Sequence, residues 1–273
     1  MTPTDSIYKQ IIAKIASSEE LIPSRNGATL RCFDLPTITF DATPLVTIRK
    51  TAWHKAIREM EWFLSGSIHC PKDLLDWWEP QLSRYNTYNR GYSEQLRYYG
   101  RNDFDQIANL IAGIRSHPYS RRHLITTWDS EDMSMITQLN SASTPTTCHT
   151  TIAQFFVSRD HFLSFHSYQR SADMLLGVPH NWIQSWALLL WVAAQTDKIP
   201  DKMLWTFGDA HLYQEESHLQ TIDQILATKE LTSPEPFPRL IYNGKEGDEF
   251  KASDFEMIGK IPAPLVTSQP KLL

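Results

Sequence analysis

The chain has 273 residues, of which 41% are hydrophobic and 21% charged, and its formal net charge is −5. This composition is typical of a globular protein with a substantial core, and the acidic balance gives no general attraction for nucleic acid or an anionic membrane. Three separate cysteines, Cys32, Cys70 and Cys148, lack C-x-x-C spacing, which argues against a disulfide framework or a Cys-based zinc site. We therefore expect no metal and a reducing compartment.

The first twenty residues lack the basic and apolar regions of a secretory signal. The longest apolar run, WALLLWVAA at 186–194, is about half of the ~20 residues that a membrane-spanning helix needs. We therefore expect a cytoplasmic protein. Because no repeat or low-complexity linker divides the chain, we expect a single domain over residues 1–273.

Apolar residues at helical spacing predict helices over 5–18, 52–65 and 103–116, the last with Asn102 or Asp103 as its cap. Between the first two, the pattern predicts two β segments within 29–49, broken by Asp-Ala-Thr-Pro.

The second half of the chain is richer in strand patterns. Strands are predicted at 122–128, 151–157, 162–169 and 203–213, with an apolar helix at 178–195 and a polar helix at 215–228. Strands and helices mix without regular alternation, which indicates an α+β fold: a mixed β-sheet with packed helices.

Cys148 lies beside His149, where a Thr-rich run gives way to an apolar one in TPTTCHTTIAQFF. An isolated cysteine usually serves as a small buried apolar side chain. A nucleophilic cysteine needs nearby positive charge or hydrogen-bond donors that lower its pKa. The segment YQRSAD supplies Arg170, Ser171 and Asp173, and an arginine with a serine suits an oxyanion such as phosphate. The alternative is a structural Arg170–Asp173 pair.

Further arginines could serve the same ligand. Arg25 precedes Gly27 in a short turn that is either a plain turn or a phosphate cradle. Arg121 and Arg122 stand side by side at the mouth of a strand, and both cannot lie on one face of it, so they could serve two different neighbours.

Other candidates sit in apolar surroundings. His211 and Tyr213 alternate on a strand, so they could bond a sugar hydroxyl or fill the core. Glu59 lies near the Trp62–Phe63 stripe of a helix, where its pKa would rise and suit proton transfer, or it is an ordinary solvated carboxylate.

Residues 83–101 interleave five tyrosines with four arginines. This composition supports a rival hypothesis, single-strand nucleic-acid binding. The acidic net charge counts against it.

In chain order, Arg25 before a glycine turn, Glu59 before WFL, Tyr92, SRR, CH, YQRSAD.LLGVPHN and GDAHLY resemble the thymidylate synthase family. The resemblance runs from about residue 7 to 266. It implies one-carbon transfer from 5,10-methylenetetrahydrofolate to C5 of a pyrimidine nucleotide, with dUMP as the expected substrate. It also implies an obligate homodimer packed through its sheet faces, in which Arg121 and Arg122 reach the partner's site.

The resemblance implies a role for each matching residue. Cys148 would add to C6, with Glu59, Tyr92, His149 and Arg170 as the other catalytic groups. The implied substrate ligands are Arg25, Arg121, Arg122, Gln169, Arg170, Ser171, Asp173, Asn181, His211 and Tyr213. Of these, Asn181 would read uracil O4 and N3, while His211 and Tyr213 would bind the 3′-hydroxyl. The implied folate contacts are Glu59, Leu75, Trp78, Asp173, Leu176, Gly177 and His180.

Several positions depart from the family pattern on the folate side. Leu75 stands where synthases have the first tryptophan of a pair completed by Trp78, with Trp77 as an alternative occupant; His180 replaces a phenylalanine. GSIHCPKDL at 66–74 replaces a Gly-Asp-Thr-Asn type of segment. One residue is added between the Cys-His pair and the following Gln-Phe, and residues 267–273 extend the tail.

These departures would wet or loosen the folate side, and water competes with hydride there. They favour dUMP 5-hydroxymethylation over reductive methylation to dTMP by a thymidylate synthase. A CMP or dCMP hydroxymethylase is a further alternative, disfavoured because such relatives carry an aspartate in place of Asn181. Hydroxymethylases of this family are typically phage enzymes that supply modified DNA, so the resemblance would then imply that role.

Overall fold

The computed structural model describes residues 2–24, 26–130, 147–229 and 236–271. Its α-helices are α1 (Pro3–Ala16), α2 (Trp53–Ser65), α3 (Leu75–Trp78), α4 (Tyr92–Arg97), α5 (Gln106–Ser116), α7 (Val178–Gln195) and α8 (Glu216–Ala227). Its strands are β1 (Leu21–Ser24), β2 (Gly27–Cys32), β3 (Ile38–Phe40), β4 (Leu124–Thr126), β5 (Ile152–Val157), β6 (Phe162–Asp173), β7 (Ile199–Tyr213), β8 (Arg239–Tyr242) and β9 (Phe255–Ile258).

The main sheet has the order β1-β2-β7-β6-β5-β4, with β3 paired to the first half of β7. Only β6 and β7 run parallel; the other neighbours are antiparallel. Strands β8 and β9 form a separate two-stranded sheet. The predicted α+β class, a mixed sheet with packed helices, is therefore confirmed.

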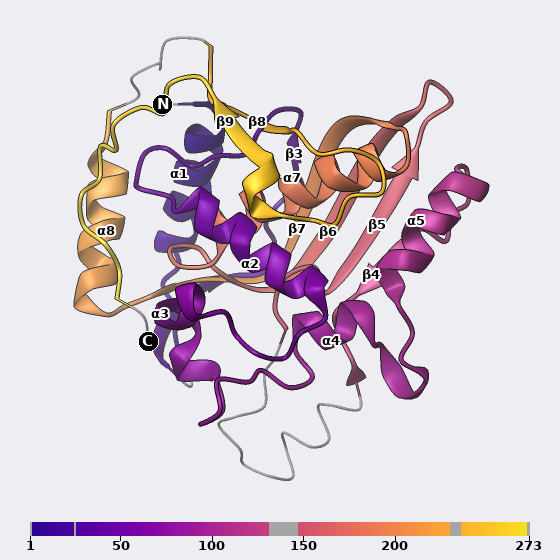
Figure 1. Cartoon of the computed structure of the whole chain (residues 1–273). Helices are drawn as coiled ribbons and strands as arrows, with labels where there is room; N and C mark the ends of the chain where they lie inside the picture. The colour runs from indigo at the N-terminus through magenta and orange to yellow at the C-terminus, as the bar shows by residue number, and fades with distance from the viewer. Residues whose placement is uncertain (1, 25, 131–146, 230–235, 272–273) are drawn as a thin grey trace.

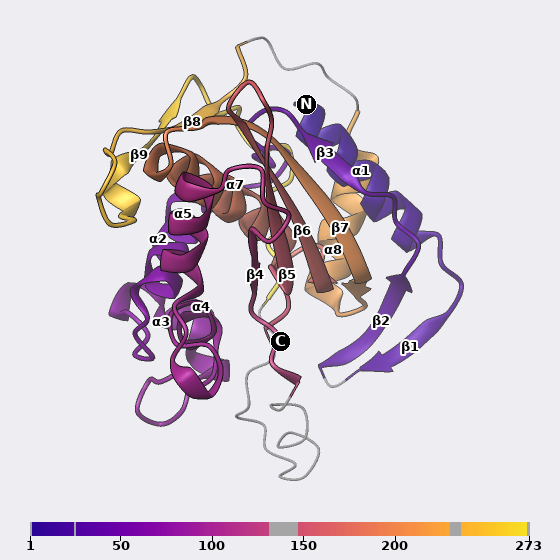
Figure 2. The ribbon, with the colours of Figure 1, turned by 90° about the vertical axis from the view of Figure 1, so that its right-hand side faces the viewer.

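The helices pack on one face of the main sheet. Figure 2 shows α2, α4 and α5 toward the β4 edge, and α1 and α8 toward β7 and β2. The predicted apolar helix at 178–195 is α7, which contacts α2 on one side and β6 and β7 on the other. No helix in the described part of the chain is long and apolar enough to span a bilayer.

The opposite face of the sheet is open. Along β5 buried residues alternate with exposed ones, and Phe156 and Ile152 are 64% and 47% exposed. Phe162 on β6 and Ile199 on β7 are also exposed. A sheet face that carries this much exposed apolar surface is typical of a protein–protein contact.

Residues 45–49 do not form a strand, so the second β segment predicted within 29–49 is wrong. The backbone N–H groups of Thr47 and Ile48 instead donate to the buried carboxylate of Asp5, at 2.6 and 2.8 Å. Thr47 Oγ1 donates to the same carboxylate at 2.7 Å. Of this segment only Arg49 makes a bridge, to Val266.

Asp5 also caps the first turn of α1. With Thr2 it forms a capping box, in which each side chain accepts the other residue's backbone N–H. The cap of α5 differs from the predicted Asn102 or Asp103. It is Asp105, whose side chain accepts from Ala108 N, while Asp103 adopts a left-handed conformation with φ 48°.

The tail beyond Val266 runs along α8, as the yellow segment in Figure 1 shows. Ser217 Oγ accepts a hydrogen bond from Lys271 N, and the ring of His218 bonds Lys271 O. Gln269 Oε1 accepts from the buried Arg49 guanidinium at 3.2 Å.

We predict that Asp5→Ala lowers the free energy of unfolding by about 3 kcal/mol, because it leaves several buried donors without an acceptor. The measurement is the urea midpoint at fixed protein concentration, with an unchanged slope. Asp223→Ala, at an exposed position of α8, is the control and should change stability by no more than about 0.5 kcal/mol. Equal effects of both substitutions would contradict the structural role of Asp5.

Candidate active site

A cleft of ≈ 220 Å³ opens where α2, α3 and α4 face the first turn of α7. Its lining consists of Glu59, Trp77, Trp78, Gln81, Tyr88, Tyr92, Cys148, His149, Leu176, Gly177, His180 and Asn181. All but Gln81 and Tyr88 are positions that the sequence singled out. The fold thus collects side chains from four helices, the turn before α7 and the segment before β5 into one space.

Cys148 and Tyr92 form the centre of the cleft. The Tyr92 hydroxyl accepts the backbone N–H groups of Cys148 at 2.8 Å and His149 at 3.3 Å. Its own proton is therefore directed to Cys148 Sγ, 3.3 Å away. One hydroxyl thus fixes the backbone of the cysteine and supplies a donor to its sulfur.

The thiol of Cys148 is held between opposing influences. Burial raises the pKa of Cys148, while the Tyr92 hydrogen bond and the Arg170 charge lower it. Arg170 lies on β6, and its backbone N–H donates to Cys148 O at 2.9 Å, which holds the two residues side by side. Burial is the largest of these influences, so the pKa of Cys148 lies above its ordinary value and the group rests as a thiol; the donor and the positive charge reduce the cost of forming the thiolate.

His149 does not act as a charged partner of Cys148. Burial lowers the pKa of His149 to about 3, so the ring is neutral at physiological pH. The ring stacks on Tyr92 with centroids 4.6 Å apart, and Phe63 also stacks on Tyr92 at 4.4 Å, while the rings of Phe63 and His149 lie 6.1 Å from each other. His149 thus packs against the tyrosine and orients it.

Glu59 is buried at the base of the cleft, as its place beside the aromatic stripe predicted. Burial raises the pKa of Glu59 to about 7, and hydrogen bonds from Trp78 and Gln184 oppose that rise. Trp78 Nε1 donates to one carboxylate oxygen and Gln184 Nε2 to the other, the latter at 2.9 Å. A carboxyl group that titrates near neutrality suits proton transfer.

His180 and Trp77 form the outer wall. The Nδ1–H of His180 donates to Leu176 O at 2.8 Å, and Nε2 accepts from Ala52 N at 3.3 Å. Burial lowers the pKa of His180 to about 4, so the ring is neutral at physiological pH. Its ring lies 4.7 Å from Trp77. Trp77 and Trp78 both line the cleft, whereas Leu75 is not among its described lining residues.

Asn181 and the Asp173–Gly177 turn complete the side next to α7. Asp173 Oδ1 accepts the N–H groups of Leu175 and Leu176, both at 2.9 Å. Gly177 O then accepts from Asn181 N at 2.9 Å. The turn therefore presents Leu176, Gly177 and Asn181 together at the start of the helix.

The remaining predicted polar residues line the ends of β6 and β7. The two strands pair in parallel, which sets Ser171 beside Asp209 and Asp173 beside His211. The rings of His211 and Tyr213 lie 5.3 Å apart, as strand alternation predicted.

No described ion pair joins Arg170 to Asp173, so the structural alternative does not hold. The Arg170 guanidinium instead lies over the Trp128 ring at 4.9 Å and donates to Thr147 O. Arg170 Nε and Gln169 Oε1 are buried and have no partner among the described residues.

Two predicted arginines, Arg121 and Arg122, do not line this cleft in the described part of the chain. Arg25 lies outside the described residues, between β1 and β2. Arg121 and Arg122 are exposed in the turn before β4, and therefore not in the strand itself.

Trp128 and Gln184 were not found from the sequence. Trp128 lies at the end of a strand pattern, and Gln184 is one of a few polar residues in a largely apolar helix, where a buried amide signals a specific partner.

The Tyr- and Arg-rich segment 83–101 folds against the protein itself. Arg90 and Arg97 form ion pairs with Asp129 and Asp105, and Arg84 lies over the Tyr85 ring. These internal partners weigh against the nucleic-acid hypothesis.

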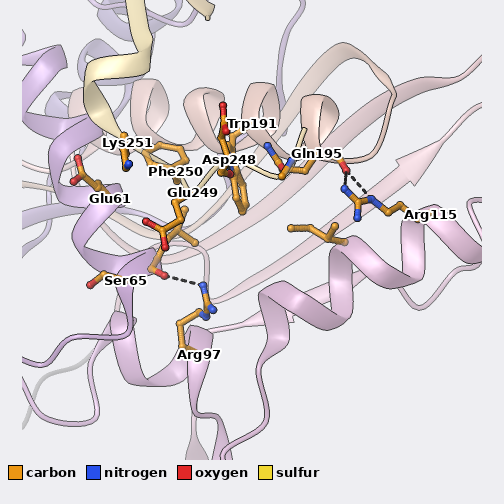
Figure 3. Close-up of a pocket in the computed structure, with 13 residues that line it drawn as sticks. Glu61, Ser65, Arg97, Arg115, Trp191, Gln195, Asp248, Glu249, Phe250 and Lys251 are labelled. Carbon is orange, nitrogen blue, oxygen red and sulfur yellow. Dashed lines mark hydrogen bonds between the residues drawn. The ribbon is translucent and has the colours of Figure 1, made fainter. Parts of the chain in front are cut away.

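A larger cavity of ≈ 480 Å³ lies between α2, α4, α5, α7 and the segment 247–251 (Figure 3). Its arginines are already engaged, since Arg97 pairs with Asp105 and Arg115 with Glu246. Among its described lining residues none is a predicted site residue. The smaller cleft is therefore the candidate active site. No described group of His, Cys, Asp or Glu there or elsewhere could hold a metal ion.

We predict that Tyr92→Phe slows alkylation of Cys148 by iodoacetamide about fivefold near neutral pH, because the thiolate loses a donor worth about 1 kcal/mol. Mass spectrometry of the digested protein measures the rate at each pH. Cys70, whose pKa burial raises to about 11, is followed in the same samples as an internal control. An unchanged or faster rate at Cys148 would show that the hydroxyl does not support the thiolate.

Comparison with known proteins shows to which family the chain belongs. The thymidylate synthase family model matches residues 6–270. A thymidylate synthase of Cereibacter sphaeroides is 28% identical over 98% of this chain and 99% of its own length, and one of Rhodopseudomonas palustris is 28% identical over 93% and 94%. A bifunctional dihydrofolate reductase-thymidylate synthase of Glycine max is 32% identical over 80% of this chain, which spans 44% of that longer protein. This family uses methylenetetrahydrofolate as co-substrate, binds dUMP and works as a dimer. The chain belongs to the thymidylate synthase family and is a one-carbon transferase.

Proposed function

We propose that the protein is a thymidylate synthase, which methylates dUMP reductively to dTMP. The observation that carries this proposal is the aromatic wall of the cleft. Trp77 and His180 pack together beside Trp78, where the sequence departures had suggested a wetter folate side and favoured hydroxymethylation. The relatives named thymidylate synthase support the same reading.

Cys148 is the proposed nucleophile. Its sulfur adds to C6 of the uracil ring, and the thiol proton leaves as the thiolate forms. Tyr92 and Arg170 assist because both favour the thiolate. The addition places negative charge on the ring, so C5 becomes nucleophilic.

The nucleotide is bound by polar groups at the ends of β6 and β7. Arg170, with its unpartnered buried Nε, and Ser171 suit the phosphate. Gln169 contributes to the same region. His211 and Tyr213, side by side on β7, suit the 3′-hydroxyl. Asn181 offers both a donor and an acceptor, which matches N3–H and O4 of uracil.

Glu59 moves protons at the base. Its pKa of about 7 lets it hold or release a proton at physiological pH. It accepts hydrogen bonds from Trp78 and Gln184, so the carboxylate has a fixed direction.

The described residues fit methylenetetrahydrofolate. The rings of Trp77, Trp78 and His180 offer an aromatic surface on which the pterin could stack. The Leu176–Gly177 turn lines the same cleft. Asp173, which fixes that turn, is the proposed partner of the pterin. When bound, the co-substrate supplies the carbon unit and, in a synthase, the hydride that reduces it.

Hydroxymethylation of dUMP is the second candidate, and the tail favours it. Residues 267–271 extend past Val266 and are tied to α8 through Gln224 and Ser217. A tail held there is less available to cover the folate side, and water would then compete with hydride. In this reading residues 267–273 are an extension of a single domain that covers the whole chain.

A homodimer through the open sheet face completes the site. The exposed apolar residues of β5 and β6 supply the contact. Arg121 and Arg122 are exposed in one chain and would reach the partner's phosphate site, to which Arg25 also contributes. Isologous contacts of this kind give two equivalent sites.

We predict that the protein converts dUMP and methylenetetrahydrofolate to dTMP and dihydrofolate. Mass spectrometry identifies the nucleotide, and absorbance at the dihydrofolate band follows the folate. Hydroxymethyl-dUMP with tetrahydrofolate would replace the first proposal by the second. Cys148→Ala should abolish turnover in both cases, and Cys32→Ala is the matched control that should retain it.

We predict that two inactive variants restore activity when mixed. Cys148→Ala lacks the nucleophile, and a protein carrying both Arg121→Glu and Arg122→Glu lacks the arginines given to the partner. In a randomised mixture one site of each mixed dimer is intact, so about a quarter of the wild-type activity should return. Absence of recovery, with mixed dimers demonstrated by tagged copurification, would place these arginines outside the partner's site.

A further inference from the structure

The carboxylate of Glu59 is held from two directions. Trp78 on α3 donates to Oε1, and Gln184 on α7 donates to Oε2 at 2.9 Å. The tryptophan was expected at the folate side, but nothing in the sequence pattern gave the glutamine a role. Gln184 is fully buried on α7, where an amide is costly unless it is bonded.

The orientation of the Gln184 amide is fixed by a second acceptor. Its Nε2 also donates to Ala56 O, one turn before Glu59 on α2, at 3.1 Å. Turning the amide over would set its oxygen against a carbonyl oxygen and a carboxylate at once. Gln184 therefore presents N–H to Glu59 irrespective of the protonation of the carboxyl group.

Other charged and titratable groups around Glu59 come from several elements. Lys55 lies one turn earlier on α2 and lowers the pKa of Glu59. Cys70, Tyr88 and Cys148 face it from segments before α3, before α4 and before β5, and burial raises the pKa of each. These three groups therefore stay neutral around and below pH 7. Of the four groups, Glu59 is the one that changes charge there.

We propose that Gln184 is a positioning residue for Glu59. Tied to Ala56 O, it aims a permanent donor at Oε2, which fixes the direction of the carboxylate toward the cleft and favours its charged form. It acts through Glu59 and does not touch the reacting atoms. The role deepens the proposed function and rests on it only for the consequence on turnover.

The test replaces Gln184 by methionine, which keeps the length and apolar volume of the side chain but removes both hydrogen bonds. In carbon-13 spectra of glutamate-labelled protein, the Glu59 carboxyl resonance, assigned by its loss in Glu59→Gln, should titrate about one pH unit higher in Gln184→Met. The sign follows because losing a donor disfavours the carboxylate. In the enzyme assay, kcat should fall about tenfold while KM for dUMP changes less than about twofold.

Gln195→Met is the matched control. Gln195 lies on the same helix, is equally buried, and bonds Lys245 O and Gly247 N in the larger cavity, away from the cleft. It loses as many hydrogen bonds, so it should cost stability without moving the Glu59 titration. Gln184→Asn, whose amide is one methylene shorter, replaces the methionine variant if that one does not fold and should also raise the midpoint.

The outcomes separate the two proposals. An unshifted Glu59 midpoint in the Gln184 variants, or an equal shift in Gln195→Met, overturns the positioning role. If the wild-type protein turns over no dUMP yet the midpoint shifts in the Gln184 variants alone, the proposed function fails and the positioning role stands.

Discussion

The packing of α7 between α2 and the parallel pair β6–β7 is the contact on which the site depends. Its first turn carries His180 and Asn181 to the cleft, and its second carries Gln184 to Glu59. Because the helix is apolar nearly all round, both of its sides are buried at once. A change in its position would therefore move Asn181, the proposed uracil ligand, and the proposed proton-transferring Glu59 together.

Around that helix, buried polar groups are given partners that set their chemistry. Tyr92 packs against both Phe63 and His149, and its hydroxyl bonds the backbone and the sulfur of Cys148. His149 contributes as a neutral ring. Burial likewise keeps His180 neutral, and two backbone hydrogen bonds fix its tautomer. Burial alone would disfavour every charge here, and specific donors decide which groups still ionise.

In the proposed homodimer, a second copy would cover the open face of the sheet. The exposed Phe156 and Ile152 and the outward turn of Arg121 and Arg122 lie on surfaces that a second copy would cover. The relation between tail and cleft is the other unusual feature. Arg49 bonds Gln269 on the tail and Leu175 O in the turn beside the cleft, so the position of the extension is connected to the folate side.

The sequence by itself determined the α+β class, the boundaries of α7, and the family, because periodic apolar runs and the YQRSAD and GDAHLY segments carry local information. It also named Cys148, Glu59 and Asn181 as candidate site residues, and all three line one cleft. Only the tertiary structure decided that Trp77 packs against His180, that residues 45–49 bond Asp5 in place of a strand, and that Gln184 bonds Glu59. Each of these depends on contacts between segments far apart in the chain, and spacing along one segment cannot encode the partner that the fold brings to it.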